Sequence, residues 1–265
     1  MQIAFLVLLF VVGACFGSFL CCQARRLRLK EHKKPSLGRR SVCMNCHYQL
    51  RWYDNLPIIS WLALRGKCRK CHKKIGVAEF LSEISLATSF FLLGLNFDLP
   101  TATPLTSIIF ILTLLFTLAI GFLAIYDGIY GELPSFALWL SIIIAIITLA
   151  LKYVDLTLKT GFSWELVYQP VLAVLLLGGI YLLLYLISKG RWVGDGDWLL
   201  GTAIAIMLAN FWLALITLFL ANFLACLVMY PAAKRRKNHQ IYFGPFLVMA
   251  FIITQSFANF FLSML

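Results

Sequence analysis

The stretch PLTSIIFILTLLFTLAIGFLAIYDGIYGELP, residues 104–134, decides the fold. Its first 23 residues carry no charge, and about 20 apolar residues in a helix suffice to cross the hydrocarbon core of a bilayer. Asp127 follows this run, and seven positions later comes Pro134, which suits the first turn of a helix because that turn needs no N–H there. We therefore expect a transmembrane helix over Pro104–Tyr126, with a carboxylate where it leaves the membrane.

The composition extends this expectation to the whole chain. Of the 265 residues, 62% are hydrophobic and 13% are charged, which is more apolar surface than a soluble domain can bury. The sequence predicts an all-α polytopic membrane protein with about eight transmembrane helices. They are expected at Ile3–Cys22, Phe80–Phe97, Pro104–Tyr126, Pro134–Leu151, Leu166–Ser188, Trp198–Leu208, Phe211–Tyr230 and Phe243–Leu265. Because only Ala209 and Asn210 separate the short sixth helix from the seventh, seven spans with one long tilted helix remain an alternative.

The positive charges suggest an orientation. Fifteen Lys and Arg residues lie between Arg25 and Lys74, and cytoplasmic loops carry the excess of such residues. Eight spans also place Lys189 with Arg191 and the run Lys234–Lys237 on the side of this loop, whereas seven spans would place one of these clusters outside. The eight-span arrangement puts Lys152, Asp155, Lys159 and Glu165 in an outer loop.

Two Cys-x-x-Cys motifs lie in the basic loop. Four thiolates presented by two such turns can close tetrahedrally on one zinc ion and leave no open coordination position, so a structural zinc site is predicted. Disulfides are the alternative, but they are rare in a reducing cytoplasm, and His47 or His72 beside the motifs could replace a thiolate. The predicted ligands are Cys43, Cys46, Cys68 and Cys71.

A second acidic segment, Gly194-Asp195-Gly196-Asp197, lies at the predicted start of helix six, on the same membrane side as Asp127. Two neighbouring carboxylates can share a proton, so that one activates water while the other polarises an amide carbonyl. Asp127 and Asp197 are therefore predicted as the catalytic pair of an intramembrane aspartyl protease. The helix dipoles suggest that Asp127 holds the proton and Asp197 is the base. Asp195 is an alternative to Asp197 as the second catalytic residue. Without a partner carboxylate, Asp197 could serve only as the cap of its helix.

Several motifs, in this order, resemble those of the type IV prepilin leader peptidases. The resemblance covers nearly the whole chain, and its Gly-x-Gly-Asp motif is shared with presenilin-like intramembrane proteases. The matching segments are Gly17-Ser18-Phe19-Leu20, the region from Ser41 to Glu83 with the four cysteines, Asp127 with Pro134, Gly194 to Asp197, and Phe243-Gly244-Pro245.

This resemblance implies a bifunctional enzyme. It would cut the leader from type IV prepilin or pseudopilin precursors, which have a basic leader and an apolar helix, through Asp127 and Asp197. It would then methylate the new N-terminus with S-adenosylmethionine, and Gly66 and Glu83 match residues of the methyl-transfer part. The implied organisation is a first transmembrane helix at 1–22, a cytoplasmic basic zinc-binding loop at 23–79 that carries the putative methyltransferase part, and a transmembrane aspartyl protease domain at 80–265. The protein would be multi-pass in the cytoplasmic (inner) membrane, with the loop and both aspartates at its cytoplasmic face.

The chain departs from the family pattern at three positions. Cys21 stands where the family usually has Asn, Leu199 stands where it usually has Lys, and Ser135 follows Pro134 where an acidic residue is common. None of these changes removes a catalytic carboxylate. They bear on methyl transfer and substrate range and not on proteolysis, so a protease that lacks methyltransferase activity is an alternative.

Three other classes of function remain open. A non-enzymatic zinc-ribbon scaffold or assembly protein would not need two aspartates on one membrane face. A transporter would carry its acids near the midplane and often shows an inverted repeat, and a cysteine protease at Cys21 or Cys22 lacks a nearby histidine. The basic loop is expected to attract anionic membrane lipids, and nucleic acid is not an expected partner.

Overall fold

The computed structural model describes residues 1–31, 41–43, 45–190, 193–235 and 242–264. Helices account for nearly all regular structure in these ranges, beside two isolated β-bridges, Val42 with Gln49 and Lys67 with Lys74. The predicted all-α fold is confirmed. The chain forms two compact units, residues 1–94 and 95–265, which are described separately. The division into functional domains at residue 79 stays a prediction.

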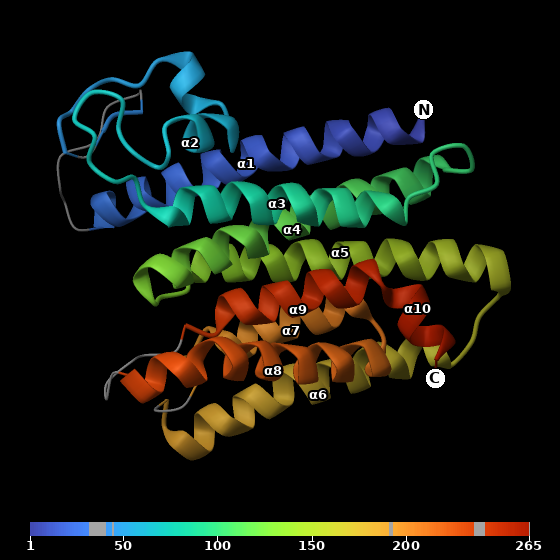
Figure 1. Cartoon of the computed structure of the whole chain (residues 1–265). Coiled ribbons are helices and arrows are strands. Elements are labelled where there is room, and N and C mark those ends of the chain that lie inside the picture. Colours follow the sequence, from blue (N-terminus) through green and yellow to red (C-terminus); the bar gives the residue numbers. More distant parts are fainter. Residues whose placement is uncertain (32–40, 44, 191–192, 236–241, 265) are drawn as a thin grey trace. The chain divides into compact units, whose positions relative to one another are not determined.

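The first unit contains two long helices joined by the cysteine-bearing loop. Its elements are α1 (Gln2–Glu31), the short 3₁₀ turn η1 (Trp52–Asn55), α2 (Ile59–Ala63) and α3 (Val77–Leu95). Helices α1 and α3 run side by side (Figure 1) and meet backbone to backbone at two glycines. A Cβ at Gly13 would lie 2.6 Å from the carbonyl oxygen of Leu86, and one at Gly17 would lie 2.6 Å from Cα of Glu83. Small residues permit this close helix packing within a membrane.

The second unit is a bundle of seven helices in its described part, whose helices run alongside one another (Figure 1). The short helix α7 packs mainly on α5 and α6, while α9 packs on α4 and α8. Phe116 of α4 and Phe251 of α9 form part of the core, with ring centroids 5.4 Å apart. The elements are α4 (Pro104–Tyr130), α5 (Ser135–Thr160), α6 (Glu165–Ser188), α7 (Asp197–Leu208), α8 (Phe211–Arg235), α9 (Gly244–Ser256) and α10 (Ala258–Ser263).

A helix occurs at each of the eight predicted positions, but eight spans are not established. Six helices in the described part of the chain are long and apolar enough to cross a membrane, and α7 and α9 are shorter. Helices α7 and α8 are separate, because Ala209 adopts a left-handed conformation and the Asn210 side chain accepts the N–H groups of Trp212 and Leu213. The last predicted helix is interrupted at Phe257.

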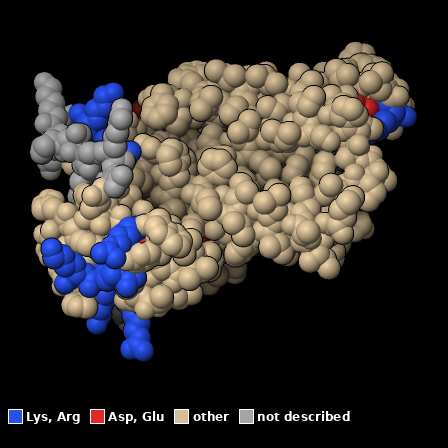
Figure 2. Space-filling model, turned by 90° about the horizontal axis from the view of Figure 1, so that it is seen from above, with Lys and Arg blue, Asp and Glu red and all other residues tan. Residues whose placement is uncertain are grey.

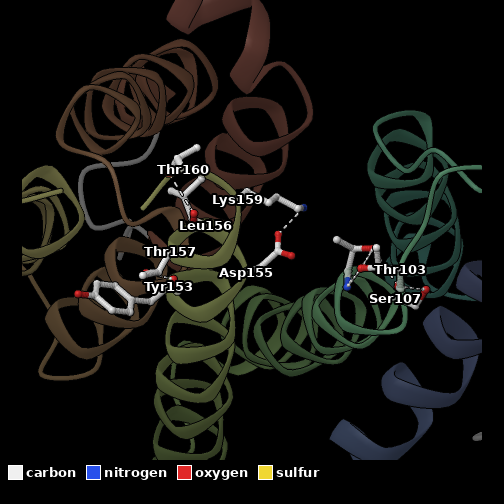
Figure 3. Close-up of polar contacts among 9 residues, drawn as sticks. Thr103, Ser107, Tyr153, Asp155, Leu156, Thr157, Lys159 and Thr160 are labelled. Carbon is white, nitrogen blue, oxygen red and sulfur yellow. Dashed lines mark hydrogen bonds and ion pairs between the residues drawn. The ribbon is translucent and has the colours of Figure 1, made fainter. Parts of the chain in front are cut away.

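None of the four residues predicted in the outer loop after the fourth helix lies in a loop, because three belong to α5 and Glu165 begins α6. Their placement on the outer side stays a prediction. Helix α5 continues to Thr160, and Lys159 donates to Asp155 one turn earlier at 2.7 Å (Figure 3). Such i,i+4 pairs stabilise a helix. Lys152 lies inside the bundle, where its Nζ donates to the carbonyl of Met207 at 2.9 Å, near the C-terminal end of α7. At the same end of the α4–α5 hairpin, Thr103 caps α4 by accepting the N–H of Thr106 on its side-chain oxygen.

The described surface has the character of a membrane protein. Large apolar side chains are exposed along the helices, as for Phe219 at 69%, Leu183 at 57% and Ile143 at 52%. On the face seen in Figure 2, uncharged side chains cover the helices, and Lys and Arg gather toward the ends. With six helices of membrane-spanning character, the chain is a multi-pass membrane protein. Some of the predicted basic residues, at 33–34, 39–40, 191 and 236–237, lie outside the described residues.

Candidate functional site

Asp127 lies in the last turn of α4 and is 6% exposed. The helix ends at Gly131, whose φ of 71° is left-handed and whose N–H bonds back to the carbonyl of Asp127. The carboxylate Oδ2 accepts the backbone N–H of Gly244 at 2.9 Å, at the start of α9. A Cβ at Gly244 would lie 2.8 Å from the same oxygen. The N-terminal end of α9 therefore closes directly on this carboxylate because residue 244 has no side chain.

Asp197 is the first residue of α7 and is 8% exposed. Its Oδ2 accepts the N–H of Gly194 at 3.0 Å, and the N-cap position of α7 is occupied by Gly196. A Cβ at Gly196 would lie 2.7 Å from that of Leu133, in the segment between α4 and α5. This contact brings the two acidic segments together.

The two aspartates thus come from different helices of one compact unit. Both are buried, and they lie near enough for their charges to interact. The start of α9 stabilises negative charge on Asp127, whereas the end of α4 disfavours it. The helix dipoles therefore do not separate the roles of Asp127 and Asp197, and the assignment of proton and base stays a prediction.

The other acidic candidates lie in different surroundings. Asp195 is exposed, although it is only two residues from Asp197, and Glu132 is exposed as well. Glu79 forms an ion pair with Arg25, and Asp98 accepts a hydrogen bond from Thr101. These environments do not match the buried pair.

In the first unit, the four predicted cysteines meet. Their sulfurs all lie within 4.8 Å of one another, a cluster that could hold a metal ion. The Cys43 and Cys71 sulfurs are 3.8 Å apart, and those of Cys46 and Cys68 are 3.9 Å apart. All four cysteines are free of disulfides. Hydrogen bonds from the Lys73 backbone and the Asn45 side chain lower the pKa of Cys71 to about 6, which favours the thiolate that a metal binds.

The two cysteine turns have the same backbone construction. The N–H of Cys43 bonds to the carbonyl of Tyr48, and the N–H of Cys68 bonds to that of Lys73. His47 and His72 each have a positive φ, 53° and 54°, just after the second cysteine of their turn. The clustered ligand atoms in the described residues are the four sulfurs, and the histidines occupy the bends of the turns.

Asp54 is a buried acid that the sequence reasoning missed. It accepts Arg69 Nε at 2.7 Å and the backbone N–H of Arg51 at 3.2 Å, and its side chain is 1% exposed. Arg69 belongs to the second cysteine turn and also lies over the ring of Tyr53, 5.0 Å from its centroid. Asp54 therefore ties the segment between the two turns to the second turn. In the sequence, the stretch Asp54-Asn55-Leu56-Pro57 pointed to this acid only because it belongs to the family motif.

Gly66 and Glu83 occupy constrained positions in the same unit. Gly66 has a φ of 63°, and a Cβ there would lie 2.8 Å from Cζ2 of Trp61. Glu83 is 7% exposed, and its Oε2 accepts the N–H of Ile58 at 2.7 Å. Ile58 has a φ of 62°, a strained conformation for a β-branched residue. Glu83 therefore holds the strained backbone that begins α2.

Comparisons with known proteins agree with these features. Residues 11–97, which include the cysteine cluster, match the bacterial peptidase A24 N-terminal domain. The prepilin leader peptidase/N-methyltransferase of Myxococcus xanthus is 40% identical over 110 residues, which cover 40% of this chain and 32% of that protein. The protein of the same name from Vibrio cholerae is 36% identical over 118 residues, which cover 37% of this chain and 47% of that protein.

A longer match includes both aspartates. The prepilin leader peptidase/N-methyltransferase of Stutzerimonas stutzeri is 26% identical over 274 aligned positions, which cover 94% of this chain and 89% of that protein. The chain thus spans about a third to a half of the length of the first two relatives and most of the third. No solved structure matches the chain with significance. In its N-terminal domain and, for one relative, along most of its length, the chain is thus similar to proteins named prepilin leader peptidase/N-methyltransferase.

Proposed function

We propose that the chain is a prepilin peptidase that cleaves the leader from type IV prepilin-like precursors by means of Asp127 and Asp197. The observation that carries this proposal is the buried pair of carboxylates, brought together from α4 and α7 on glycine-rich segments. Relatives named prepilin leader peptidase/N-methyltransferase support the same activity.

The backbone contacts suggest how the pair would work. Each carboxylate uses its Oδ2 to accept a glycine N–H, from Gly244 for Asp127 and from Gly194 for Asp197. The other oxygen of each then remains for a water molecule or for the scissile carbonyl. One carboxylate takes a proton from water as the water oxygen forms a bond to the carbonyl carbon, while the other, protonated, donates to the carbonyl oxygen. Collapse of this intermediate expels the amine, which takes up a proton as the C–N bond breaks.

The proposed substrate is a membrane-inserted precursor with a short basic leader and an apolar helix. Cleavage would occur where that helix leaves the membrane on the cytoplasmic side, because Asp127 and Asp197 lie at the ends of their helices. A helix must be unwound before a bond in it is hydrolysed, and Gly194, which is exposed, allows an extended strand to lie close to the backbone. The excess of Lys and Arg in the loop supports its cytoplasmic placement in the inner membrane and its contact with anionic lipids.

We further propose that the cysteine cluster binds zinc and that the first unit takes part in N-methylation. Tetrahedral zinc with Zn–S bonds of about 2.3 Å requires sulfurs about 3.8 Å apart, and the observed separations of 3.8 and 3.9 Å fit this requirement. S-adenosylmethionine would supply an electrophilic methyl group, which forms a bond to the amine nitrogen as the C–S bond breaks, its electron pair stays on sulfur, and the amine proton passes to solvent. Methylation rests on the relatives' name and on the family match of Gly66 and Glu83.

The test is cleavage of a prepilin-like substrate in membranes, followed by mass spectrometry of the product N-terminus. Asp127→Asn and Asp197→Asn should each reduce the rate by about 10²–10⁴-fold, which is the usual contribution of a general acid or base. Asp195→Asn, which alters an exposed carboxylate in the same motif, is the matched control and should retain cleavage. An added methyl group on the wild-type product would support the second activity. Unchanged cleavage by both variants would favour the alternative, a non-enzymatic zinc-ribbon scaffold.

A further inference from the structure

A buried tyrosine on α6 lies beside the helix that carries Asp197. Tyr181 is 3% exposed, and a Cβ at Gly201 would come within 3.1 Å of its Cδ2. Gly201 follows Asp197 by four residues, and side chains four positions apart lie on the same face of a helix. Tyr181 therefore packs on the face of α7 that presents Asp197.

The same ring also contacts the segment that holds Asp127. Its centroid lies 5.3 Å from that of Phe243, and the next residue, Gly244, donates its N–H to Asp127 Oδ2. The phenol oxygen of Tyr181 is near enough to Asp197 for a charge on one to act on the other. Among the described residues, however, the hydrogen-bond partner of this oxygen is not an aspartate. Tyr181 thus lies close to the catalytic pair without being bonded to it.

Asn222 of α8 determines how the phenol can use its hydrogen. Its Nδ2 donates to the carbonyl of Leu218 at 2.8 Å and to the phenol oxygen of Tyr181 at 3.3 Å. Only the nitrogen of an amide side chain can donate to a carbonyl, so Tyr181 is the acceptor in its pair with Asn222 and keeps its own O–H as a donor. Within the described part of the chain, no acceptor takes up this hydrogen. A polar side chain in the apolar part of a membrane helix is costly and by default suggests a function.

We propose that the Tyr181 hydroxyl donates a hydrogen bond to the oxygen of the scissile carbonyl, beside Asp197, and this inference rests on the peptidase activity proposed above. When water adds to the carbonyl carbon, an electron pair moves onto that oxygen, and a donor already in position stabilises the developing charge. Tyr181 transfers no proton, so the two aspartates keep the roles of acid and base. Tyr181 is thus a further catalytic residue of the site.

Asn222 is a positioning residue in this arrangement, because it acts only through the phenol. By donating to the phenol oxygen, it leaves the O–H free to turn toward the substrate. A chain of hydrogen bonds also polarises its members, so that the phenol becomes a stronger donor. The amide and the phenol should therefore contribute to the rate as one unit.

The test is the steady-state cleavage of a prepilin-like substrate by the full-length protein in detergent. Tyr181→Phe keeps the ring against Gly201 and Phe243 and removes only the hydroxyl. Its kcat should fall about 10²-fold, the usual loss when one donor to a developing oxyanion is removed, while KM stays unchanged. Tyr168→Phe, which alters an exposed tyrosine of the same helix, is the matched control and should keep the wild-type kcat. The thermal midpoint shows whether each variant is folded.

A double-mutant cycle with Asn222→Ala distinguishes this role from packing. Asn222→Ala alone should lower kcat about tenfold, as expected for the loss of one hydrogen bond. In the Tyr181→Phe protein it should lower kcat no further, because residues that act as one unit are not additive. Losses that multiply would overturn the proposal.

Two other results would also count against Tyr181. A Tyr181→Phe protein with the wild-type kcat would show that the hydroxyl does not act on the reacting oxygen, and a raised KM at unchanged kcat would assign it to substrate binding. If Tyr181→Phe does not fold, Asn222→Ala, which leaves the ring in place, carries the test, and a wild-type kcat in that variant overturns the proposal. A wild-type protein that leaves the precursor uncut would instead contradict the proposed peptidase activity itself.

Discussion

At the scale of single residues, Gly244 is the residue that positions Asp127 of the aspartate pair. Its N–H holds Asp127 Oδ2, and its missing Cβ leaves room for the same oxygen. Gly244→Ala should displace the carboxylate and reduce cleavage by about 10²-fold, which is the usual cost of a misplacement of about 1 Å. The measurement is the initial rate of prepilin cleavage at equal protein level.

The matched control for this prediction is Gly179→Ala in α6. A Cβ at Gly179 meets nothing within 4 Å, so this variant should cleave at the wild-type rate. If Gly244→Ala also cleaves at that rate, the N-terminal end of α9 does not position Asp127.

The sequence indicated which side chains the structure brings together, but not which other residues hold them in place. Asp127, Asp197 and the four cysteines carry distinctive spacings, whereas Gly244 is 117 positions from the carboxylate that it holds. Such a contact depends on how α9 packs on α4, which no local pattern encodes. Asp54 was missed for the same reason, because its burial depends on Arg69, 15 positions away.

At the scale of elements, the close approach of α1 and α3 should stabilise the first unit. Gly17→Ala would place a methyl group against the backbone of α3 near Glu83. Overpacking of this kind usually costs about 1–3 kcal/mol, so the thermal midpoint of the detergent-solubilised protein should fall. Gly179→Ala again serves as the control. A Gly17→Ala protein as stable as the wild type would show that the two helices can separate at little cost.

The cysteine turns should depend on bound metal. Cys68→Ser removes a ligand from the cluster, whereas Cys226→Ser changes an exposed thiol of α8. The loop has little apolar surface and cannot fold without metal. Loss of the metal should therefore unfold the cysteine turns and expose their backbone to proteases. Metal analysis should find zinc in Cys226→Ser and little in Cys68→Ser, and trypsin should cut only the latter rapidly between residues 41 and 75. Equal resistance to trypsin would mean that the turns fold without metal.

The positions of the helices could be predicted from hydropathy. Their ends could be predicted only where a particular residue type, such as a capping residue or proline, marks them. Helix α4 begins at Pro104 as expected, because proline favours the first turn of a helix, and the structure adds an oxygen cap from Thr103. Helix α1 runs nine residues beyond Cys22, to Glu31, since charged side chains limit the membrane span without breaking the helix. The break at Phe257 has no glycine or proline beside it and was not predictable.

At the scale of the whole molecule, the two proposed activities belong to different compact units. Asp127, Asp197 and the glycines that hold them lie within residues 95–265. The cysteine cluster, Gly66 and Glu83 lie within residues 1–94. Each unit therefore contains its own set of reactive groups, and damage to one set need not impair the other.

This separation predicts complementation between two damaged proteins. Glu83→Gln should release a cut but unmethylated product, because its aspartates are intact, whereas Asp197→Asn should leave the precursor uncut. When both are reconstituted in the same vesicles, the product released by the first should reach the intact first unit of the second and gain a methyl group. Mass spectrometry of the product N-terminus measures this outcome, and each variant alone at doubled concentration is the control. A mixture that yields only unmethylated product would mean that the new N-terminus passes between the units of one molecule without release.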